Sequence, residues 1–343
     1  MSRGSTYVYV GNAGTRDVSA YAMNGDGTLT PIGTFAVSGP TAACFSLPLA
    51  VSPDNGFLFA ALRNEPWSVR SFAIDAASGR LDDLGAGPLA ANPCYLRVDK
   101  TGRFLLSASY FGSKIAVNRI GANGIVEPAH QVIETEPKSH AIVLDATNRH
   151  AISTSLGGEI VYQWRFDSEF GRLAPNEPPF VRVADYAGPR HFVFHPDGRR
   201  AYLLNEHVVT IHVYDYDPDR GTLSEKQVTT SWAPPLAAKM SAADIHVTPN
   251  GRFLYASERK SNTLALYAID AHDGTLAFKD QIVTETYPRG FAIDPDGRFL
   301  YCAGQQSDRV CAYAIDPLSG KLSKIAAYVA GGGPNWIEIV RPR

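Results

Sequence analysis

The feature of this sequence that most constrains its fold is an internal repeat. The segment 245-IHVTPNGRFLYASERKSNTLALYAIDAHDGTL closely resembles 291-FAIDPDGRFLYCAGQQSDRVCAYAIDPLSGKL, and copies starting at residues 49, 96, 142 and 192 follow the same order of residue types. Steps of 47, 46, 50, 53 and 46 residues separate the equivalent turn positions Pro53, Lys100, Ala146, Pro196, Pro249 and Pro295. A period of about 40–50 residues is typical of an array built from one supersecondary unit.

Each copy reads as four short strands joined by a Pro-Asp-Gly-type turn, a polar loop and an Asp/Gly turn. The strands alternate and are rich in Val, Ile, Tyr and Phe, and the Asp-Gly turns supply the positive φ that tight hairpins need. A seventh copy is split, because residues 336–340 match its first strand and residues 6–29 supply the rest. The sequence therefore predicts an all-β fold, a seven-bladed β-propeller closed by pairing of the N- and C-terminal strands. We expect one domain over residues 1–343.

Composition and charge exclude several classes of protein. The chain has 32 Lys and Arg against 34 Asp and Glu, which gives no electrostatic case for a nucleic-acid partner. A hydrophobic content of 45% excludes the disordered and low-complexity classes. The sequence has no long apolar window, no signal-peptide pattern and four scattered cysteines without a Cys-x-x-Cys pair. We therefore expect a soluble, cytoplasmic protein that has no membrane partner.

Propeller geometry predicts where polar side chains gather. The first strand of a blade lines the central channel and ends at the Pro-Asp-Gly turn on the lower face, so residues just before this strand and just after the second share the upper face. These positions hold Arg63, Tyr110, His140, Arg190, His191, Glu206, Asp244, His246, Glu258, Arg259, Arg289, Gln305 and Trp336. Arginine forks suit carboxylates and phosphates, and Glu and His offer acid–base groups. The upper face is therefore the predicted small-molecule site.

Several runs carry a resemblance to a known family. They are Gly188-Pro189-Arg190-His191, Asn205-Glu206, Ala243-Asp244-Ile245-His246 and Pro288-Arg289-Gly290-Phe291. Over essentially the whole chain, the sequence resembles the lactonase-type seven-bladed propellers, which include bacterial cycloisomerase-like 6-phosphogluconolactonases and fungal carboxymuconate lactonizing enzymes. The resemblance implies an enzyme that opens or closes a lactone without a metal or organic cofactor. By residue-by-residue correspondence it implies catalytic roles for Arg190, Glu206, Arg259 and His140.

The chain departs from this family pattern at two places. It has Ser257-Glu258-Arg259 where the family often has Ser-Asn-Arg. It also has Pro137-Lys138-Ser139-His140 where the family often has Pro-His-x-His. The additional acid and the exchanged histidine point to a changed substrate.

We expect hydrolysis of an anionic sugar lactone, 6-phosphogluconolactone first among them. Glu206 or a neighbouring histidine would take a proton from water, and Arg190 or Arg259 would stabilise the oxyanion. Arg289 and Arg63 would hold the phosphate or carboxylate. The other upper-face residues are predicted to bind substrate: Tyr110, His191, Asp244, His246, Glu258, Gln305 and Trp336.

Two alternatives remain open from the sequence. A carboxymuconate-type cycloisomerase, or another lactonase of sugar-acid or aromatic breakdown, needs the same groups. A non-catalytic propeller scaffold should instead show an exposed apolar face. We expect neither cofactor nor metal ion, and a monomer because ring closure leaves few strand edges to pair.

Overall fold

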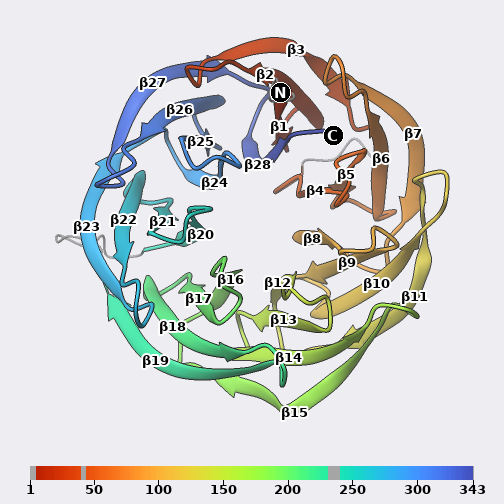
Figure 1. Cartoon of the computed structure of the whole chain (residues 1–343). Coiled ribbons are helices and arrows are strands. Elements are labelled where there is room, and N and C mark those ends of the chain that lie inside the picture. Colours follow the sequence, from red (N-terminus) through yellow and green to blue (C-terminus); the bar gives the residue numbers. More distant parts are fainter. Residues whose placement is uncertain (1–4, 40–43, 231–239, 343) are drawn as a thin grey trace.

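The computed structural model describes residues 5–39, 44–230 and 240–342. Within these ranges it contains 28 β-strands and no helix. The strands form seven four-stranded antiparallel sheets, arranged as blades around a central axis (Figure 1). The predicted all-β, seven-bladed β-propeller is confirmed.

The strands of the first four blades follow one another in chain order. Blade 1 holds β4 (Leu49–Val51), β5 (Phe57–Leu62), β6 (Ser68–Ile74) and β7 (Leu81–Pro88). Blade 2 holds β8 (Tyr95–Val98), β9 (Phe104–Ser109), β10 (Lys114–Ile120) and β11 (Val126–Glu134). Blade 3 holds β12 (Ser139–Leu144), β13 (His150–Ser155), β14 (Ile160–Asp167) and β15 (Arg172–Arg182). Blade 4 holds β16 (Pro189–Phe194), β17 (Arg200–Asn205), β18 (Thr210–Asp217) and β19 (Thr222–Thr230).

The last three blades complete the ring, and the seventh combines both ends of the chain. Blade 5 holds β20 (Ala242–Val247), β21 (Phe253–Glu258), β22 (Thr263–Ile269) and β23 (Leu276–Val283). Blade 6 holds β24 (Pro288–Ile293), β25 (Phe299–Gly304), β26 (Arg309–Ile315) and β27 (Leu322–Val329). Blade 7 holds β28 (Pro334–Val340), β1 (Thr6–Asn12), β2 (Asp17–Met23) and β3 (Leu29–Ala36).

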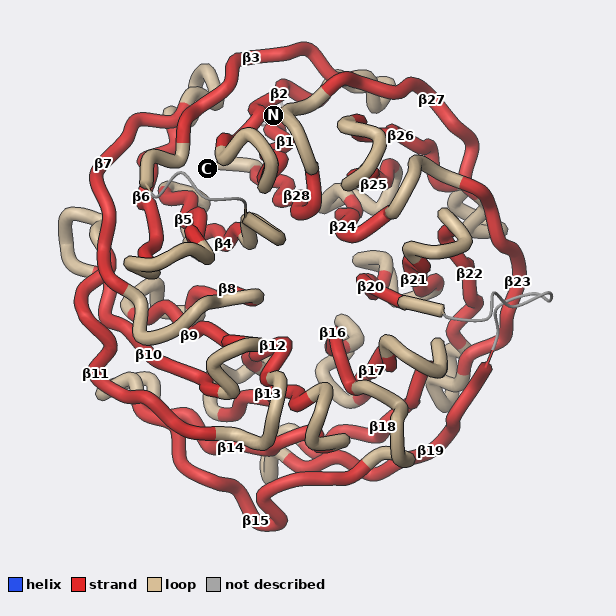
Figure 2. Tube along the Cα trace, turned by 180° about the vertical axis from the view of Figure 1, so that it is seen from behind, coloured by secondary structure: helices blue, strands red, loops and turns tan. Residues whose placement is uncertain are grey.

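The ring closes as predicted, by pairing of the terminal strands. β1 and β28 are antiparallel, with Tyr7 opposite Val340 and Val10 opposite Ile337. Just after β28, the Arg341 guanidinium donates to both carboxylate oxygens of Asp296 in blade 6, at 3.1 and 2.9 Å. The strands β1 and β28 lie side by side in both opposite views (Figures 1 and 2).

The core lies between neighbouring blades, and a buried tyrosine fastens several of these joints. Tyr9, Tyr202, Tyr255 and Tyr301 occupy the same place in the second strand of blades 7, 4, 5 and 6. Their hydroxyls donate to the carbonyls of Gly79, Gly274, Gly320 and Gly27, respectively, at 2.5–3.0 Å. Each glycine lies in the outer turn of the next blade with φ between 70 and 83°, a backbone conformation that favours glycine.

Blades 1 to 3 have apolar residues at the same position. Phe59, Leu106 and Ile152 are fully buried there, and their side chains carry no hydroxyl to make this hydrogen bond. Other side chains connect these blades, as when Gln131 of blade 2 donates to the Leu173 carbonyl of blade 3 at 2.8 Å.

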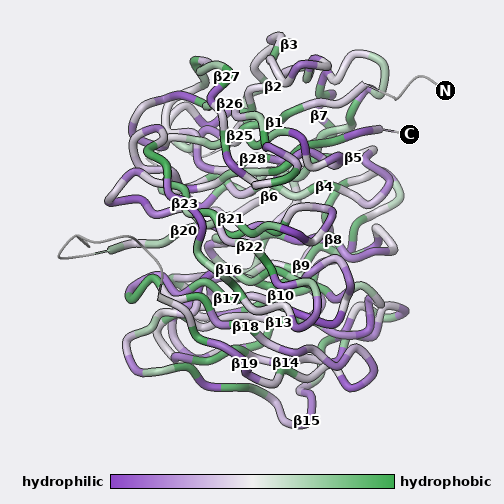
Figure 3. The backbone as a smooth tube through the Cα atoms, turned by 60° about the vertical axis from the view of Figure 1, so that its left-hand side comes forward, coloured by the Kyte–Doolittle hydropathy of each residue, from purple (hydrophilic) through white to green (hydrophobic). Residues whose placement is uncertain are grey.

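Hydrophobic and hydrophilic stretches are interleaved along the whole chain (Figure 3). Within the described ranges, no helix is long and apolar enough to cross a membrane.

Candidate active site

Local breaks in strand pairing deliver the site residues to the channel. Near its upper end, the first strand of blades 3 to 7 carries a register shift. The residues that these shifts leave out of the ladder are His140, Arg190, Ala243, Asp244, Arg289 and Asn335. A β-bulge re-aims the side chain of its extra residue. The bulges therefore lie where His140, Arg190 and Arg289 reach the channel mouth.

A pocket of about 190 Å³ opens at this upper mouth. Residues from both sides of the ring line it: Phe45, Arg63, Cys94, Tyr110, Phe111, His140, Glu206, Arg259 and Arg289. As the repeat geometry predicts, residues just before a first strand and residues just after a second strand share this face.

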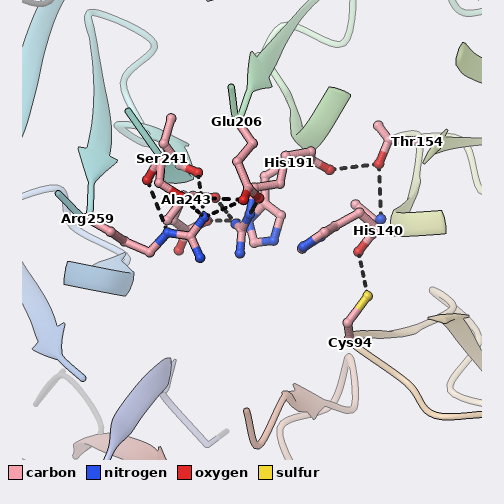
Figure 4. Close-up of polar contacts among 12 residues, drawn as sticks. Cys94, His140, Thr154, His191, Glu206, Ser241, Ala243 and Arg259 are labelled. Atoms are coloured by element: carbon pink, nitrogen blue, oxygen red, sulfur yellow. Dashed lines mark hydrogen bonds and ion pairs between the residues drawn. The ribbon is translucent and has the colours of Figure 1, made fainter. Parts of the chain in front are cut away.

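Glu206 lies between two arginines at the pocket wall. It follows β17, and its Oε2 accepts from Arg190 Nε at 2.9 Å while its Oε1 lies 2.8 Å from Arg259 Nη2 (Figure 4). Burial alone would raise the pKa of Glu206, but the charges of Arg259 and Arg190 outweigh it and lower the pKa to about 2. The carboxylate is therefore ionised, and it holds both guanidinium groups in place.

Backbone carbonyls complete the support of these two arginines. Arg190, which is 1% exposed, also donates from Nη1 to the Ala243 carbonyl. Arg259 donates to the Ser241 carbonyl at 3.1 Å and to the Ser241 hydroxyl at 2.6 Å (Figure 4). The Arg259 guanidinium also lies 5.4 Å from the centre of the Tyr287 ring. Both side chains are thus fixed before any ligand arrives.

The other two arginines of the site have no acidic partner among the described residues. Arg63 donates to Asn92 Oδ1 and Ser46 Oγ, each at 2.7 Å, and both acceptors are neutral. Within the described ranges, no hydrogen bond or ion pair reaches the Arg289 guanidinium. Burial, with the charges of Arg190 and Arg259, lowers the pKa of Arg289 to about 9. Arg289 is still a cation at pH 7, crowded by other cations.

His140 is the histidine that faces this pocket directly. It is 4% exposed, its ring lies 5.9 Å from that of Tyr110, and its Nδ1 has no hydrogen-bond partner among the described residues. Burial and the charge of Arg190 lower the pKa of His140 well below its usual value. The imidazole is therefore neutral at pH 7 and able to exchange a proton.

A second histidine lies deeper and is held by a carboxylate. His191 Nδ1 and Asp244 Oδ1 are 2.7 Å apart, and Asp244 Oδ2 lies 3.1 Å from His246 Nε2. Burial would raise the pKa of Asp244, but His246 and His191 hold it well below its usual range. Burial, with the charge of Arg190, lowers the pKa of His191 to about 4. Asp244 is therefore a carboxylate that accepts from two imidazoles.

An aromatic floor separates the upper pocket from the lower channel. The Tyr95 ring packs edge-on against both His191 and Trp336, with ring centres 5.3 Å apart in each pair. Below this floor, a cavity of about 260 Å³ is lined by Arg97, His246 and Glu338 among others. Trp336 and His246 line this lower cavity and not the upper pocket.

The structure brings together most of the predicted site residues. Those that line the upper pocket are Arg63, Tyr110, His140, Glu206, Arg259 and Arg289. Arg190 pairs with Glu206, and His191 and Asp244 lie just beneath, lining a small adjoining void with Arg190. Gln305 lies at the rim, where its Nε2 donates to the Phe45 carbonyl at 2.9 Å.

Glu258 requires a correction, because the structure does not bring it to the pocket. Its Oε1 accepts from the Ser241 amide at 2.5 Å, and its Oε2 accepts from the amide and hydroxyl of Ser261 at 2.5 and 2.6 Å. The carboxylate is fully buried and satisfies loop amides. Although Glu258 is next to Arg259 in the sequence, its carboxylate holds the loop after β21 and does not line the pocket.

Four side chains of the site were absent from the predicted set. They are Phe45, Cys94 and Phe111, which line the upper pocket, and Ser46, which lines the void. Cys94 occupies the same repeat position as His140 and Arg190, so alignment of the copies contains the signal for it. Phe45 and Phe111 lie in loops, where the repeat gives no register.

The described residues contain no group of three or more His, Cys, Asp or Glu side chains placed to hold a metal ion. His191 and His195 do not converge, since each is bound to its own acceptor, Asp244 and the Gly251 carbonyl.

Comparison with known proteins agrees with the geometry. The family model described as "Lactonase, 7-bladed beta-propeller" matches residues 8–339. The chain is 34% identical over 333 residues to a protein of Pectobacterium carotovorum named 6-phosphogluconolactonase, covering 97% of this chain and 98% of that protein. A 6-phosphogluconolactonase of Yersinia pestis is 32% identical over 332 residues, with 97% of each chain covered.

A solved structure gives the same result. The periplasmic gluconolactonase of Pseudomonas aeruginosa superposes with a TM-score of 0.90 at 28% identity, covering 99% of this chain and 100% of that one. Both the sequence match and the blade architecture extend over nearly the whole length. The chain therefore belongs to the lactonase family of seven-bladed β-propellers.

Proposed function

We propose that this protein hydrolyses an anionic sugar lactone, 6-phosphogluconolactone, to 6-phosphogluconate. The observation that carries the proposal is the charge balance of the upper pocket. Arg63, Arg259 and Arg289 line it, Arg190 lies beside it in contact with Glu206, and Glu206 is the single acidic side chain among the described residues that line it. Crowded cations repel one another, and a bound anion relieves that cost. The names of the relatives supply the lactone and its phosphate.

The arginines divide into two groups by how they are held. Arg190 and Arg259 are fixed by Glu206 and backbone carbonyls. We assign them to the carbonyl oxygen of the lactone, where a preorganised donor contributes about 3–4 kcal/mol to the transition state. Arg289 and Arg63 have no acidic partner in the part of the chain that the structure describes. We assign them to the substrate phosphate, which guanidinium forks bind in a bidentate manner.

Proton transfer falls to histidine in this proposal. Of the two bases that the sequence leaves open, Glu206 is unsuited, because two ion pairs lower its pKa to about 2. His140 is neutral and faces the pocket. Water attack on the carbonyl carbon forms a tetrahedral oxyanion, and its collapse breaks the ring C–O bond. We assign His140 to the ring oxygen, which must gain a proton as it leaves.

The test is hydrolysis of 6-phosphoglucono-1,5-lactone with the spontaneous rate subtracted. We expect a clear enzymatic excess, which Arg289→Gln lowers about 100-fold in kcat/KM because one charge-assisted contact is lost. Arg309→Gln is the matched control, since Arg309 is an exposed arginine on β26 of the same blade. No excess for the wild type, or equal effects of both substitutions, would contradict the proposal.

We also propose that the protein acts in the cytoplasm. Its four cysteines are free thiols, as is usual in a reducing compartment, and its relatives are named for a phosphorylated substrate. The Pseudomonas neighbour is described as periplasmic, so fractionation of the native host is decisive. We expect the protein in the spheroplast fraction; release by osmotic shock would overturn this location.

A further inference from the structure

We infer that His191, oriented by Asp244, is the general base that activates the hydrolytic water, and that this water binds in the small void beneath the substrate pocket. The inference rests on the proposed lactone hydrolysis and adds to it the residue that removes the proton from water.

The void has the size and lining of a water site. Its volume is about 10 Å³, which is roughly what one water molecule requires. Polar side chains line most of it, including Ser46, Arg190, His191, Arg289 and Asn335. Cys94 and Arg289 line both the void and the upper pocket. A water in the void would thus lie directly next to the substrate.

The hydrogen bonds around His191 fix which ring nitrogen carries the proton. Asp244 Oδ1, 2.7 Å from Nδ1, also accepts from the Ile245 amide, and its Oδ2 accepts from the Phe291 amide and faces His246. An ionised carboxylate can only accept, so Nδ1 is the protonated nitrogen. Nε2 therefore presents a lone pair, as in other histidines that an aspartate orients for catalysis.

That lone pair has no donor among the described residues. His191 is 6% exposed, and its Nε2 is buried without a hydrogen-bond partner. An unsatisfied buried acceptor is destabilising, and a water in the adjoining void would satisfy it. In the same hydrogen bond the water would point one of its protons at Nε2, the atom that takes this proton in the reaction.

Neither other candidate base has this arrangement. No described residue makes a hydrogen bond to His140 Nδ1, so His140 has no carboxylate that sets its tautomer as Asp244 does for His191. Both oxygens of Glu206 are occupied by arginines.

In the proposed hydrolysis, His191 takes the first proton from the attacking water. The water oxygen forms a bond to the lactone carbonyl carbon, the carbonyl π electrons move to the oxygen, and the water proton passes to His191 Nε2. When the oxyanion collapses, the ring C–O bond breaks and the proton held by His191 passes to the ring oxygen through the adjacent His140, whose ring centre lies 5.3 Å away. His140 accepts a proton on one ring nitrogen as it donates from the other, so it ends neutral. The new carboxylic acid loses its remaining proton to solvent, and the product is the hydroxy acid in its ionised form.

His246 contacts Asp244 from the lower side of the aromatic floor. Replacing it therefore changes the charge near His191 without altering the lining of the substrate pocket. The His246 side chain is 37% exposed and lines the lower cavity, away from the substrate pocket. Its positive form lowers the pKa of His191. Charged and titratable groups face His191 from several strands: Arg190 on its own strand, Asp244 and His246 on β20, His140 on β12, Cys94, Tyr95 and Arg97 at β8, Arg289 on β24, and Glu338 on β28.

The first experiment compares His191→Asn and Asp244→Asn with a matched control. His212→Asn removes another buried histidine whose Nδ1 is 2.7 Å from a carboxylate, that of Glu225, between β18 and β19. We expect kcat to fall about 100-fold or more in both site variants, as for loss of a general base, with little change in KM. The control should stay within about threefold of the wild type. Unchanged binding of 6-phosphogluconate shows that the site variants are folded.

The second experiment uses a different variant, so its result does not depend on whether His191→Asn and Asp244→Asn fold. In His246→Gln the positive charge near His191 is lost, so the pKa of His191 rises. In the pH profile of kcat/KM, the fall on the acidic side then moves to higher pH. An acid limb that stays where it is in the wild type would overturn the inference, as would His191→Asn with wild-type kcat. A wild-type protein that is inactive on 6-phosphoglucono-1,5-lactone would overturn the proposed function, and this inference with it.

Discussion

Blades 4 to 6 lie across the ring from blades 1 and 2 (Figure 1). The two sides line one pocket with different chemistry. Glu206, Arg259 and Arg289 come from the first side. Phe45, with an exposed fraction of 67%, and Phe111, with 63%, come from the second, where their rings lie 6.1 Å apart. Arg63 is the cation of the aromatic side and lies 5.7 Å from the Phe111 ring. One side suits an anionic group and the other an apolar or sugar-ring face.

Part of the difference arises at one repeat position. At the upper end of the first strand, blades 4 and 6 have Arg190 and Arg289, whereas the equivalent residues of blades 1 and 2 are Leu47 and Cys94. Replacing one residue per repeat therefore changes the site and leaves the blade intact. The strands and turns carry the fold, and the ends of the inner strands carry the chemistry.

Removing the carboxylate of the charged side should have the largest effect on stability. The pKa of Glu206 is about 2 in the folded protein, below its ordinary value of 4.5. Its ionised form thus stabilises the fold fully above about pH 4.5, by about 3 kcal/mol, and this contribution is lost as the pH falls toward 2. Glu206→Gln should lose it at pH 7 and show a flatter acid dependence of the free energy of unfolding.

Urea unfolding between pH 3 and pH 7 measures this effect. Glu225→Gln is the control, because Glu225 is half-exposed and pairs only with His212. Equal stability of Glu206→Gln and the wild type at pH 7 would show that Glu206 does not hold the arginines together.

Removing the charge of Arg289, on the same side of the pocket, should raise the stability of the fold. Arg289→Gln relieves repulsion from Arg190, Arg259 and Arg63. We expect the free energy of unfolding to rise by about 1 kcal/mol while activity falls, the usual exchange at a site built for a ligand. A destabilised variant would mean that Arg289 has a structural role.

The aromatic side should affect binding more weakly. Phe111→Ala removes a ring that contacts Tyr110 at 5.2 Å and Arg63. We expect KM to rise about threefold to tenfold, in line with the loss of about 1 kcal/mol of ring contact, with kcat little changed. Steady-state kinetics on the phosphorylated lactone measures it; a large fall in kcat would place chemistry on this side of the pocket.

The smallest effect on activity should come from the joints between blades. Tyr255→Phe deletes the hydroxyl that donates to the Gly320 carbonyl. Loss of this buried hydrogen bond should cost about 1 kcal/mol of stability without changing kcat/KM. Phe59 already occupies the equivalent position of blade 1, so the ring alone fits there. Thermal unfolding decides; an unchanged midpoint would mean that packing alone fastens these joints.

The sequence predicts the fold well because every copy repeats the same turn and strand pattern. The split seventh copy also predicts the pairing of β1 with β28. It places Arg190, Glu206, Arg259 and Arg289 on one face for the same reason. It cannot show that the Glu258 carboxylate turns into its own loop, because that depends on amide positions after β21. Nor can it show that Asp244 bridges two histidines, since the bulge in β20 sets that direction.

The most direct test of the account is discrimination between two lactones that differ only in the phosphate. The wild-type protein is assayed on 6-phosphoglucono-1,5-lactone and on glucono-1,5-lactone, with spontaneous rates subtracted, at low and high salt. The arginine excess predicts a kcat/KM about 100-fold or more higher for the phosphorylated lactone, with the advantage shrinking as salt screens the charges. Equal turnover of both lactones, or a preference for the uncharged one, would contradict an anion-binding role for the pocket.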